Sequence, residues 1–314
     1  MQGGWTVALK IKYTPEKNGE TRLWKKERVM YITFPALDQF NDRLVNAFST
    51  RKGGFSKGIY KSMNLGLDNG DSKENVLFNY REFSKMIGIR YKNIVISNQK
   101  HEDNILIAGE DDRGKGICKE RDYESVDGMI TNEPGVGLCL LFADCVPVYL
   151  YDPKRNAIGL FHSGWKGTVK EISGKGVRMM QKEYGSKPED LIACIAPSIC
   201  KECYEVSSDL YAEFQGVFPE EEMKEIFADG KDSGHFQLDL WKAIQFTLLR
   251  NGVQKDNIHV TDICTYHNPD LLFSHRYTHG KRGNLAAVLM LLPEPPEDPQ
   301  LFKNLLPTLK SLRK

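Results

Sequence analysis

The sequence lacks the long apolar runs that carry a chain into or across a membrane. Its first residues, Met-Gln-Gly-Gly-Trp-Thr-Val, do not form the apolar core of a secretion signal. Its most apolar internal stretch is interrupted by Asp144, well short of the roughly 20 apolar residues that a spanning helix needs. We therefore expect a cytoplasmic protein without a membrane partner.

The chain also lacks an excess of either charge. Its 43 basic and 42 acidic residues leave a formal net charge of +1 over 314 residues. Because no strong overall field draws such a protein to nucleic acid, we expect no nucleic-acid partner. With 40% hydrophobic and 27% charged residues, the composition is typical of a soluble globular protein, either a monomer or a homodimer.

The chain also lacks an even number of cysteines, which a fully paired set of disulfides would require. Seven cysteines in a chain of this length fit a reducing compartment better than a disulfide framework. Cys118, Cys139 and Cys194 stand beside apolar residues or within expected strands, and we interpret them as small buried hydrophobic side chains. Cys200-Lys-Glu-Cys203 is a lone C-x-x-C pair, which is a weak signal of zinc binding or redox chemistry.

No internal repeat, low-complexity tract or Pro/Gly-rich linker divides the chain before Pro293. The sequence therefore predicts one main domain at 41–292. We expect a peripheral β-rich segment at 1–40 ahead of it. A Pro-rich turn and a short C-terminal helix or tail are expected at 293–314.

Apolar residues recur at helical spacing in three segments, and each segment ends at a glycine. The first begins with Asp71 and Glu74 in a capping-box arrangement. The expected helices are residues 71–88, the segment between Gly167 and Gly185, and the segment from Asp239 as N-cap to Asn251-Gly252.

Short β-branched and aromatic runs predict eight strands, joined by both hairpins and helical crossovers. This mixture favours mixed β-sheets flanked by helices, that is, an α/β (α+β) sandwich of three or four layers, over a doubly wound parallel sheet. The expected strands are 44–49, 94–98, 136–142, 146–151, 157–162, 191–195, 258–263 and 285–292.

One expected hairpin places a thiol and an imidazole side by side. Its two strands flank the turn-forming run Asp152-Pro-Lys-Arg-Asn and pair about a midpoint near Lys154. This pairing sets Cys145 opposite residue 163, next to His162, and cross-strand neighbours have Cβ atoms roughly 5 Å apart. A cysteine and a histidine at one sheet edge suit either a zinc ion or a Cys/His catalytic pair.

A third ligand is proposed from the end of another strand, where a sheet edge can present His101. Three protein ligands leave the fourth tetrahedral position to water, which is the arrangement of a catalytic zinc. Two alternatives stay open. One is a metal-free hydrolase with Cys145 as nucleophile and His162 as base, and the other is a closed structural site completed by His275 or Cys203.

Two segments carry groups that suit an anion. In Arg51-Lys-Gly-Gly-Phe-Ser-Lys-Gly, the glycines let backbone N–H groups approach an anion, and the arginine can bind phosphate or carboxylate through two nitrogens. Ser274-His275-Arg276 places an imidazole and a guanidinium together ahead of a basic loop at 278–283. The histidines interpreted as surface or loop residues without a partner are His235, His259 and His267.

Several short motifs occur together and in a characteristic order. They are Phe48-Ser-Thr-Arg51-Lys-Gly-Gly-Phe-Ser56, Asn64-Leu-Gly, Gln99-Lys-His101, Val126-Asp-Gly-Met-Ile-Thr, Ala143-Asp-Cys145-Val-Pro, His162-Ser-Gly-Trp-Lys-Gly, Ala196-Pro-Ser-Ile, Cys203-Tyr-Glu-Val and Phe273-Ser-His-Arg276. In these motifs the chain resembles the laccase-domain, or "polyphenol oxidase", family of purine nucleoside phosphorylases, over residues 44–292.

The resemblance implies a single zinc ion held by His101, Cys145 and His162. Asp144, beside the cysteine ligand, is a further candidate catalytic residue that would orient a proton, with a buried structural aspartate at a turn as the alternative. The resemblance also implies phosphorolysis of adenosine, inosine, guanosine and methylthioadenosine, with phosphate as co-substrate, and deamination of adenosine. Family members have also been linked to peptidoglycan editing, so a structural metalloprotein of cell-envelope maintenance is kept as an alternative. The candidate contacts to nucleoside or phosphate are Arg51, Ser56, Asn64, Gln99, His275 and Arg276.

The laccase label itself fits the sequence poorly. A multicopper oxidase needs many histidines, often in His-x-His pairs, whereas this chain has seven histidines and no such pair. A site of nitrogen and sulfur ligands can still take up copper in vitro, because such ligands generally bind Cu²⁺ more tightly than Zn²⁺. Many members also have Gly-Arg before the final Ala-Ala. Here Asn284 replaces that arginine, so a basic substrate contact is missing or is supplied by Arg282 or Lys281.

Overall fold

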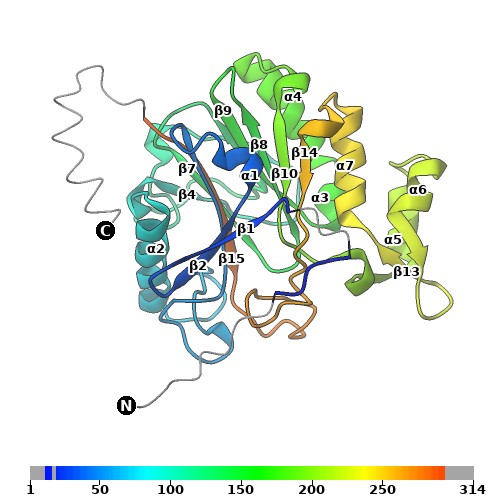
Figure 1. Cartoon of the computed structure of the whole chain (residues 1–314), viewed down its shortest axis with the longest axis horizontal. Coiled ribbons are helices and arrows are strands. Elements are labelled where there is room, and N and C mark those ends of the chain that lie inside the picture. The colour runs from blue at the N-terminus through cyan, green and yellow to red at the C-terminus, as the bar shows by residue number, and fades with distance from the viewer. Residues whose placement is uncertain (1–10, 16–18, 294–314) are drawn as a thin grey trace.

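Two six-stranded sheets lie at the centre of the fold in the computed structural model, which describes residues 11–15 and 19–293 (Figure 1). The first sheet has the order β1 (Arg22–Lys26), β2 (Val29–Thr33), β3 (Leu44–Ser49), β15 (Leu285–Leu291), β7 (Gly137–Phe142) and β4 (Ile94–Ile96). The second has the order β14 (Ile258–Val260), β10 (Ile192–Ile195), β8 (Val146–Asp152), β9 (Ala157–Ser163), β6 (Gly128–Thr131) and β5 (Ile105–Ile107).

Parallel pairing is confined to the ends of these two sheets. Strand β4 runs parallel to β7, β5 to β6, and β14 to β10, whereas the other strand pairs are antiparallel. The mixed sheets predicted from the sequence are therefore confirmed. A third sheet is small and has the order β11 (Glu205–Ser207), β13 (His235–Leu238) and β12 (Phe227–Asp229).

Helices cover both outer faces of the paired sheets. The α-helices are α1 (Pro35–Asp38), α2 (Lys73–Ile87), α3 (Trp165–Val169), α4 (Ile172–Tyr184), α5 (Ser208–Gln215), α6 (Glu220–Ile226) and α7 (Leu240–Arg250). Short 3₁₀ turns are η1 (Gly58–Tyr60), η2 (Tyr91–Asn93), η3 (Glu110–Asp112), η4 (Pro188–Asp190), η5 (Lys201–Cys203) and η6 (Lys255–Asn257). Figure 1 shows α2 beside the first sheet and α4 and α7 beside the second.

The alternation of side chains along the strands divides the apolar residues into three cores. In β7, Leu138 and Leu140 point into the core between the two sheets, whereas Cys139 points into the core under α2. In β8, Tyr149 enters the core between the sheets and Val148 enters the core under α4 and α7. The predicted sandwich is confirmed, and it has four layers, with a helical layer on each outside face.

The three predicted helices are present, with two corrections: one concerns an N-cap, and the other an interruption within a helix. Helix α2 is capped by Ser72, which accepts a hydrogen bond from a backbone N–H, rather than by Asp71. The segment expected as one helix before Gly185 is two helices, because Glu171 adopts a left-handed φ of 52° between α3 and α4. Helix α7 begins at its expected N-cap, Asp239, whose carboxylate accepts the backbone N–H of Lys242 at 2.9 Å.

The third sheet and its flanking helices α5 and α6 were not predicted. Their strands are three or four residues long, too short to show a clear alternation. Strands β1 and β2 fall within the segment expected to be β-rich, of which residues 1–10 and 16–18 lie outside the described part of the chain. The C-terminal helix expected at 293–314 lies outside it from residue 294 onward.

Within the described ranges, none of the helices combines the length and the apolarity that crossing a bilayer requires.

Candidate metal centre

Three side chains able to bind a metal ion meet near the start of β8. Cys145 directly precedes β8, His162 lies in β9, and His101 lies in the loop between β4 and β5. The Sγ atom of the cysteine and one ring nitrogen of each histidine lie within 4.8 Å of one another. The two imidazole rings meet edge to face with their centroids 4.8 Å apart. The structure thus brings together the three residues that were grouped from the sequence.

The β8–β9 register differs by one residue from the prediction. Val146 pairs with Ser163, so Cys145 lies beside Gly164 rather than opposite residue 163. The reason is that the turn between the paired strand ends has an even number of residues, so its centre falls between two residues. A Cβ atom on Gly164 would lie 2.9 Å from Sγ of Cys145 and 3.4 Å from Nδ1 of His101. Glycine therefore keeps the space between the donor atoms open.

One buried carboxylate, that of Asp127, holds both histidines. It accepts a hydrogen bond from Nδ1 of His162 at 2.8 Å, which leaves Nε2 of that ring as the nitrogen available to a metal ion. It also accepts the backbone N–H groups of Lys100, His101 and Glu102 at 2.8 to 3.1 Å. His101 stands at the centre of this turn with a left-handed φ of 60°.

Asp127 was not predicted to be a functional residue, although it lies within one of the motifs. The signal available was a lone acidic residue inside the apolar run Val126-Asp-Gly-Met-Ile. A carboxylate in such a position is buried only when it is well paired, so its burial itself points to a positioning role.

The charges of the cluster favour a thiolate at Cys145. Burial opposes ionisation, but the positive field of His162 and hydrogen bonds from His101 and His162 lower the pKa of Cys145 to about 6. Burial also works against a charged His162, yet the thiolate and the carboxylate of Asp127 raise the pKa of its imidazole to about 9. A thiolate is the form of cysteine that binds metal ions, so the cluster presents Cys145 in its ligand form at neutral pH.

Asp144 is buried at a turn with a left-handed φ of 83°, and the fold occupies both of its carboxylate oxygens. Oδ1 accepts the hydroxyl of Thr265 at 2.6 Å, and Oδ2 accepts the backbone N–H of Arg276 at 2.6 Å. The side chain next to Cys145 is thus bonded at two points to the connection between β14 and β15. These contacts indicate a positioning role for Asp144.

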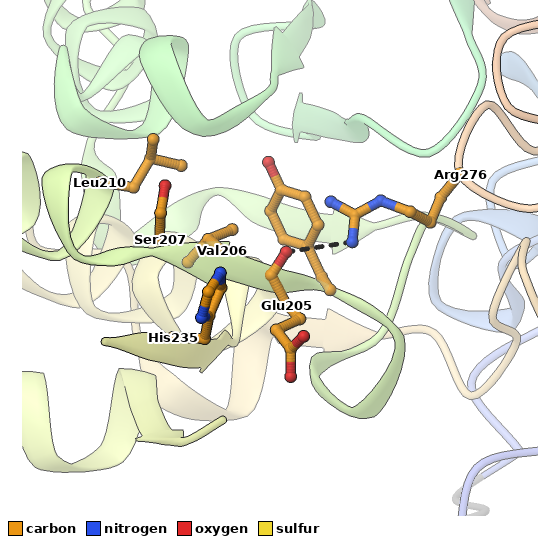
Figure 2. A pocket seen from close by; sticks show the side chains of 7 residues that line it. Glu205, Val206, Ser207, Leu210, His235 and Arg276 are labelled. Atoms are coloured by element: carbon orange, nitrogen blue, oxygen red, sulfur yellow. Dashed lines mark hydrogen bonds between the residues drawn. The ribbon is translucent and has the colours of Figure 1, made fainter. Parts of the chain in front are cut away.

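An open cavity of about 470 Å³ is lined in part by Arg276, whose backbone N–H binds Asp144, the neighbour of Cys145 (Figure 2). Arg276 forms one wall, where its guanidinium donates to the backbone carbonyl of Glu205 at 3.0 Å and stands over the ring of Tyr204 at 5.0 Å. Figure 2 shows this guanidinium opposite Leu210 and His235, which come from α5 and β13. Burial, together with the negative charges of Cys145 and Asp144, raises the pKa of Tyr204, so this wall is in electrostatic contact with the cluster.

Arg282 is a further cation near the cluster. One Nη atom donates to Oδ1 of Asn284 at 2.8 Å, and the other lies 3.5 Å from Nδ1 of His275. Its Nε is buried without an acceptor among the described residues. Burial lowers the pKa of Arg282, and the negative fields of Asp144 and Cys145 oppose this shift. A half-buried guanidinium with an unused donor suits an anion, and Asn284 orients it.

The side chain of Arg51 binds backbone carbonyl groups of the protein itself. Its Nε donates to the backbone carbonyl of Lys61 at 2.9 Å, and one Nη atom donates to that of Pro269 at 2.7 Å. The guanidinium also lies over the ring of Phe273 at 4.5 Å from its centroid. These contacts join three loops.

Ser56, Asn64 and Gln99 also lie within hydrogen-bond networks of the fold. The hydroxyl of Ser56 accepts from a buried asparagine side chain at 2.8 Å. Asn64 is fully buried and accepts the backbone N–H of Asn284 at 2.8 Å. Gln99 pairs with both backbone groups of Leu141, each at 2.8 Å, and so continues the pairing of β7 beyond the end of β4. As substrate contacts, these three residues stay a prediction.

A second group of metal-binding side chains was missed in the sequence. Cys200, Cys203, Cys264 and His267 lie together, with their donor atoms within 4.8 Å of one another. The interpretation of His267 as a residue without a partner is therefore wrong, as is that of His259, which pairs with Glu20. Because Cys203 belongs to this second group, it does not complete the first one.

The interpretation of three cysteines as small buried hydrophobic side chains is confirmed for Cys139 and Cys194, which are fully buried. It is wrong for Cys118, which is exposed. Among the described residues, the first group consists of three donors, and His275 is not one of them. A closed site completed by His275 or Cys203 is therefore not what this structure contains.

The donor set of the first group fits a zinc ion. One thiolate and two imidazoles are soft and borderline ligands, which suit zinc or copper and not magnesium or calcium. The carboxylate behind His162 is the support that metal-binding histidines usually have. The space bounded by Gly164 leaves the donor atoms free of other side chains on that side.

A four-layer α/β sandwich with a His/Cys/His candidate metal centre defines the class to which this protein belongs. The family described as "Multi-copper polyphenol oxidoreductase laccase" matches residues 45–292. The chain belongs to this family, and the resemblance inferred from its motifs is confirmed.

Named relatives and solved structures that are similar to this chain support its membership of the family. Purine nucleoside phosphorylase YlmD of Bacillus subtilis is 34% identical over 256 residues, which cover 80% of this chain and 90% of the relative. A purine nucleoside phosphorylase of Bacteroides thetaiotaomicron is 36% identical over 245 residues, covering 77% and 90%. The crystal structure of YlmD from Geobacillus stearothermophilus superposes with a TM-score of 0.78 at 31% identity, covering 86% of this chain and 99% of that one.

The lowered pKa of Cys145 predicts an early onset of alkylation in chelator-treated protein. We expect a half-maximal rate of iodoacetamide labelling near pH 6, against about 8.5 for a free cysteine. Because thiolate forms as pH rises through the pKa, labelling at pH 7 should already be close to its plateau. Mass spectrometry of the Cys145 peptide provides the measurement.

The variant Asp127→Asn gives the matched comparison. It removes the charge that supports a protonated His162, so the midpoint for Cys145 should move to higher pH. A wild-type midpoint at the free-cysteine value of about 8.5 would contradict the electrostatic account.

Proposed function

We propose that the chain is a zinc-dependent purine nucleoside phosphorylase that also deaminates adenosine. The observation that carries this proposal is the convergence of His101, Cys145 and His162, supported by Asp127. The names of the relatives in Bacillus subtilis and Bacteroides thetaiotaomicron support the substrate class. The family description mentions several copper ions, but the seven histidines without a His-x-His pair argue against such a set of sites.

In this proposal, His101, Cys145 and His162 hold the zinc ion, which supplies Lewis acidity to the site. Asp127 fixes the ring of His162 and the turn that carries His101, so the ligands are positioned before a metal ion arrives. The free thiols of all seven cysteines support the expected cytoplasmic, reducing location.

Phosphorolysis requires a bound anion close to the sugar. A phosphate oxygen attacks C1′ of the ribose, the bond from C1′ to the purine nitrogen breaks, and its electron pair leaves with the base, which takes up a proton. Arg282 is our candidate for holding phosphate, because its buried Nε is an unused donor near Cys145. Arg276 and Tyr204 line the cavity, and their stacked side chains present a flat surface for a purine.

Deamination replaces the amino group at C6 by the oxygen of a water molecule, and ammonia leaves with the proton that it gains. His275 is a candidate proton carrier, since it is exposed beside Arg282. Partial burial of the ring and the positive charge of Arg282 lower the pKa of His275, so the imidazole is neutral at pH 7 and can accept a proton.

The alternative is a metal-free hydrolase, and one observation favours it. With a pKa of about 6 for Cys145 and about 9 for His162, the pair has the charge state of an activated cysteine nucleophile. Against it stand the third donor, His101, and the space kept open by Gly164, which a Cys/His pair does not need. Chelation separates the two functions, because only the zinc enzyme should lose activity with its metal.

Adenosine turnover by pure protein tests the proposal. With phosphate we expect adenine or hypoxanthine to appear together with ribose 1-phosphate, and without phosphate we expect only inosine. Cys145→Ala should lower both rates by about 100-fold or more, because the loss of metal-ion catalysis costs several kcal/mol of transition-state stabilisation. Products are separated by chromatography.

Cys118→Ala is the matched control, since this cysteine is exposed and belongs to neither group of donors. It should keep wild-type rates. If Cys145→Ala matches the wild type, or if activity survives chelator and stoichiometric iodoacetamide at Cys145 abolishes it, the zinc proposal fails.

The variant Arg282→Gln tests the phosphate site separately. Because charge-assisted hydrogen bonds contribute about 1.5–3 kcal/mol, the KM for phosphate should rise by about 10- to 100-fold. Deamination in the absence of phosphate should change much less. The exposed neighbour Lys281, changed to Gln, is the control and should leave the KM nearly unchanged. Equal effects of the two substitutions would contradict the assignment of Arg282 as a phosphate-binding residue.

A further inference from the structure

We propose that Cys200, Cys203, Cys264 and His267 bind a second zinc ion in a closed, structural site. Their donor atoms lie within 4.8 Å of one another. A tetrahedral zinc ion with Zn–S bonds of about 2.3 Å sets its sulfur ligands roughly 3.8 Å apart. The four side chains therefore already occupy the volume of one coordination sphere.

Two short turns supply these ligands. Cys200 and Cys203 frame the turn η5, and Cys264 and His267 have the same spacing in the loop after β14. A parallel bridge between Ser198 and Cys264 holds the two turns side by side. C-x-x-C and C-x-x-H turns that face each other have the spacing of structural zinc sites, whereas a lone C-x-x-C does not.

The contacts inside the group are those expected around a metal thiolate. Sγ of Cys264 accepts the backbone N–H of Cys200 at 3.3 Å. Nε2 of His267 lies 3.1 Å from Sγ of Cys203, and its Nδ1 lies 4.0 Å from Sγ of Cys200. Backbone N–H groups directed at sulfur are the supporting contacts that stabilise the charge of metal-bound thiolates.

A closed donor set implies a structural role. Four protein ligands leave no coordination position for a substrate, and two of them, Cys200 and Cys264, are buried. A disulfide would use only two of the three thiols and would leave the third thiol and the imidazole without a function.

The position of the second site shows what it would stabilise. Tyr204, in the cavity wall, directly follows Cys203. Thr265 directly follows Cys264, and its hydroxyl donates to Asp144, the neighbour of Cys145. One zinc ion would thus fix both the cavity wall and the loop that supports the first centre. The existence of the second site does not depend on the proposed activity.

Zinc content per chain, measured by mass spectrometry of the intact, zinc-reconstituted protein, tests this proposal. We expect two zinc ions in the wild type and in Cys118→Ser, and one in Cys264→Ser and in Cys203→Ser. His101→Ala should also hold one, and the double variant His101→Ala with Cys264→Ser should hold none. A wild-type chain with a single zinc ion that Cys264→Ser does not remove would overturn the proposal.

Site-resolved alkylation of the wild type covers the case in which these variants do not fold. Cys200, Cys203 and Cys264 should be protected in the zinc-loaded chain and should become reactive only after chelator is added. Equal labelling with and without chelator, or recovery of two of them as a disulfide, would contradict a second zinc site. A chain that holds two zinc ions but fails to turn over adenosine would contradict the proposed activity and would still support this second site.

Discussion

The hydrogen bonds of the buried Asp127 carboxylate are the interaction on which the candidate metal centre depends. The carboxylate accepts from the ring of His162 and from three successive backbone N–H groups around His101. An ionised carboxylate is costly to bury unless it is paired. Here the hydrogen bonds that compensate for burial also position two candidate ligands, one from the loop after β4 and one from β9.

The four-layer architecture explains why a carboxylate is needed to hold these ligands in position. His101 leaves the first sheet after β4, whereas Cys145 and His162 belong to the β8–β9 hairpin of the second sheet. Packing between the sheets sets their spacing but does not orient a loop at their edge. Asp127, just ahead of β6, provides the missing connection, and Asp144 does the same for the loops that carry Thr265 and Arg276.

Local patterns in the sequence predicted the longer helices and most strands of the two large sheets, together with one half of the centre, but not β5, β6 or the third sheet. The hairpin brings Cys145 and His162 together through pairing alone, so a turn and two apolar strands sufficed to predict their contact. Placing His101 requires knowledge of how two sheets pack, and only the family motifs supplied it. The second group stayed hidden because Cys203 and Cys264 lie far apart in the sequence, and because a histidine replaces the cysteine that would have completed a second C-x-x-C pair.

We infer that the Asp127 carboxylate positions His101 and His162 to bind a metal ion together with Cys145. The most direct test is the zinc affinity of Asp127→Asn, measured by competition with a chelator in a Cys264→Ser background so that one centre is observed. Because the loss of a carboxylate behind a metal-binding histidine typically costs about 10- to 100-fold in affinity, we expect zinc binding to weaken by that factor while the fold is retained. An unchanged affinity would contradict the account.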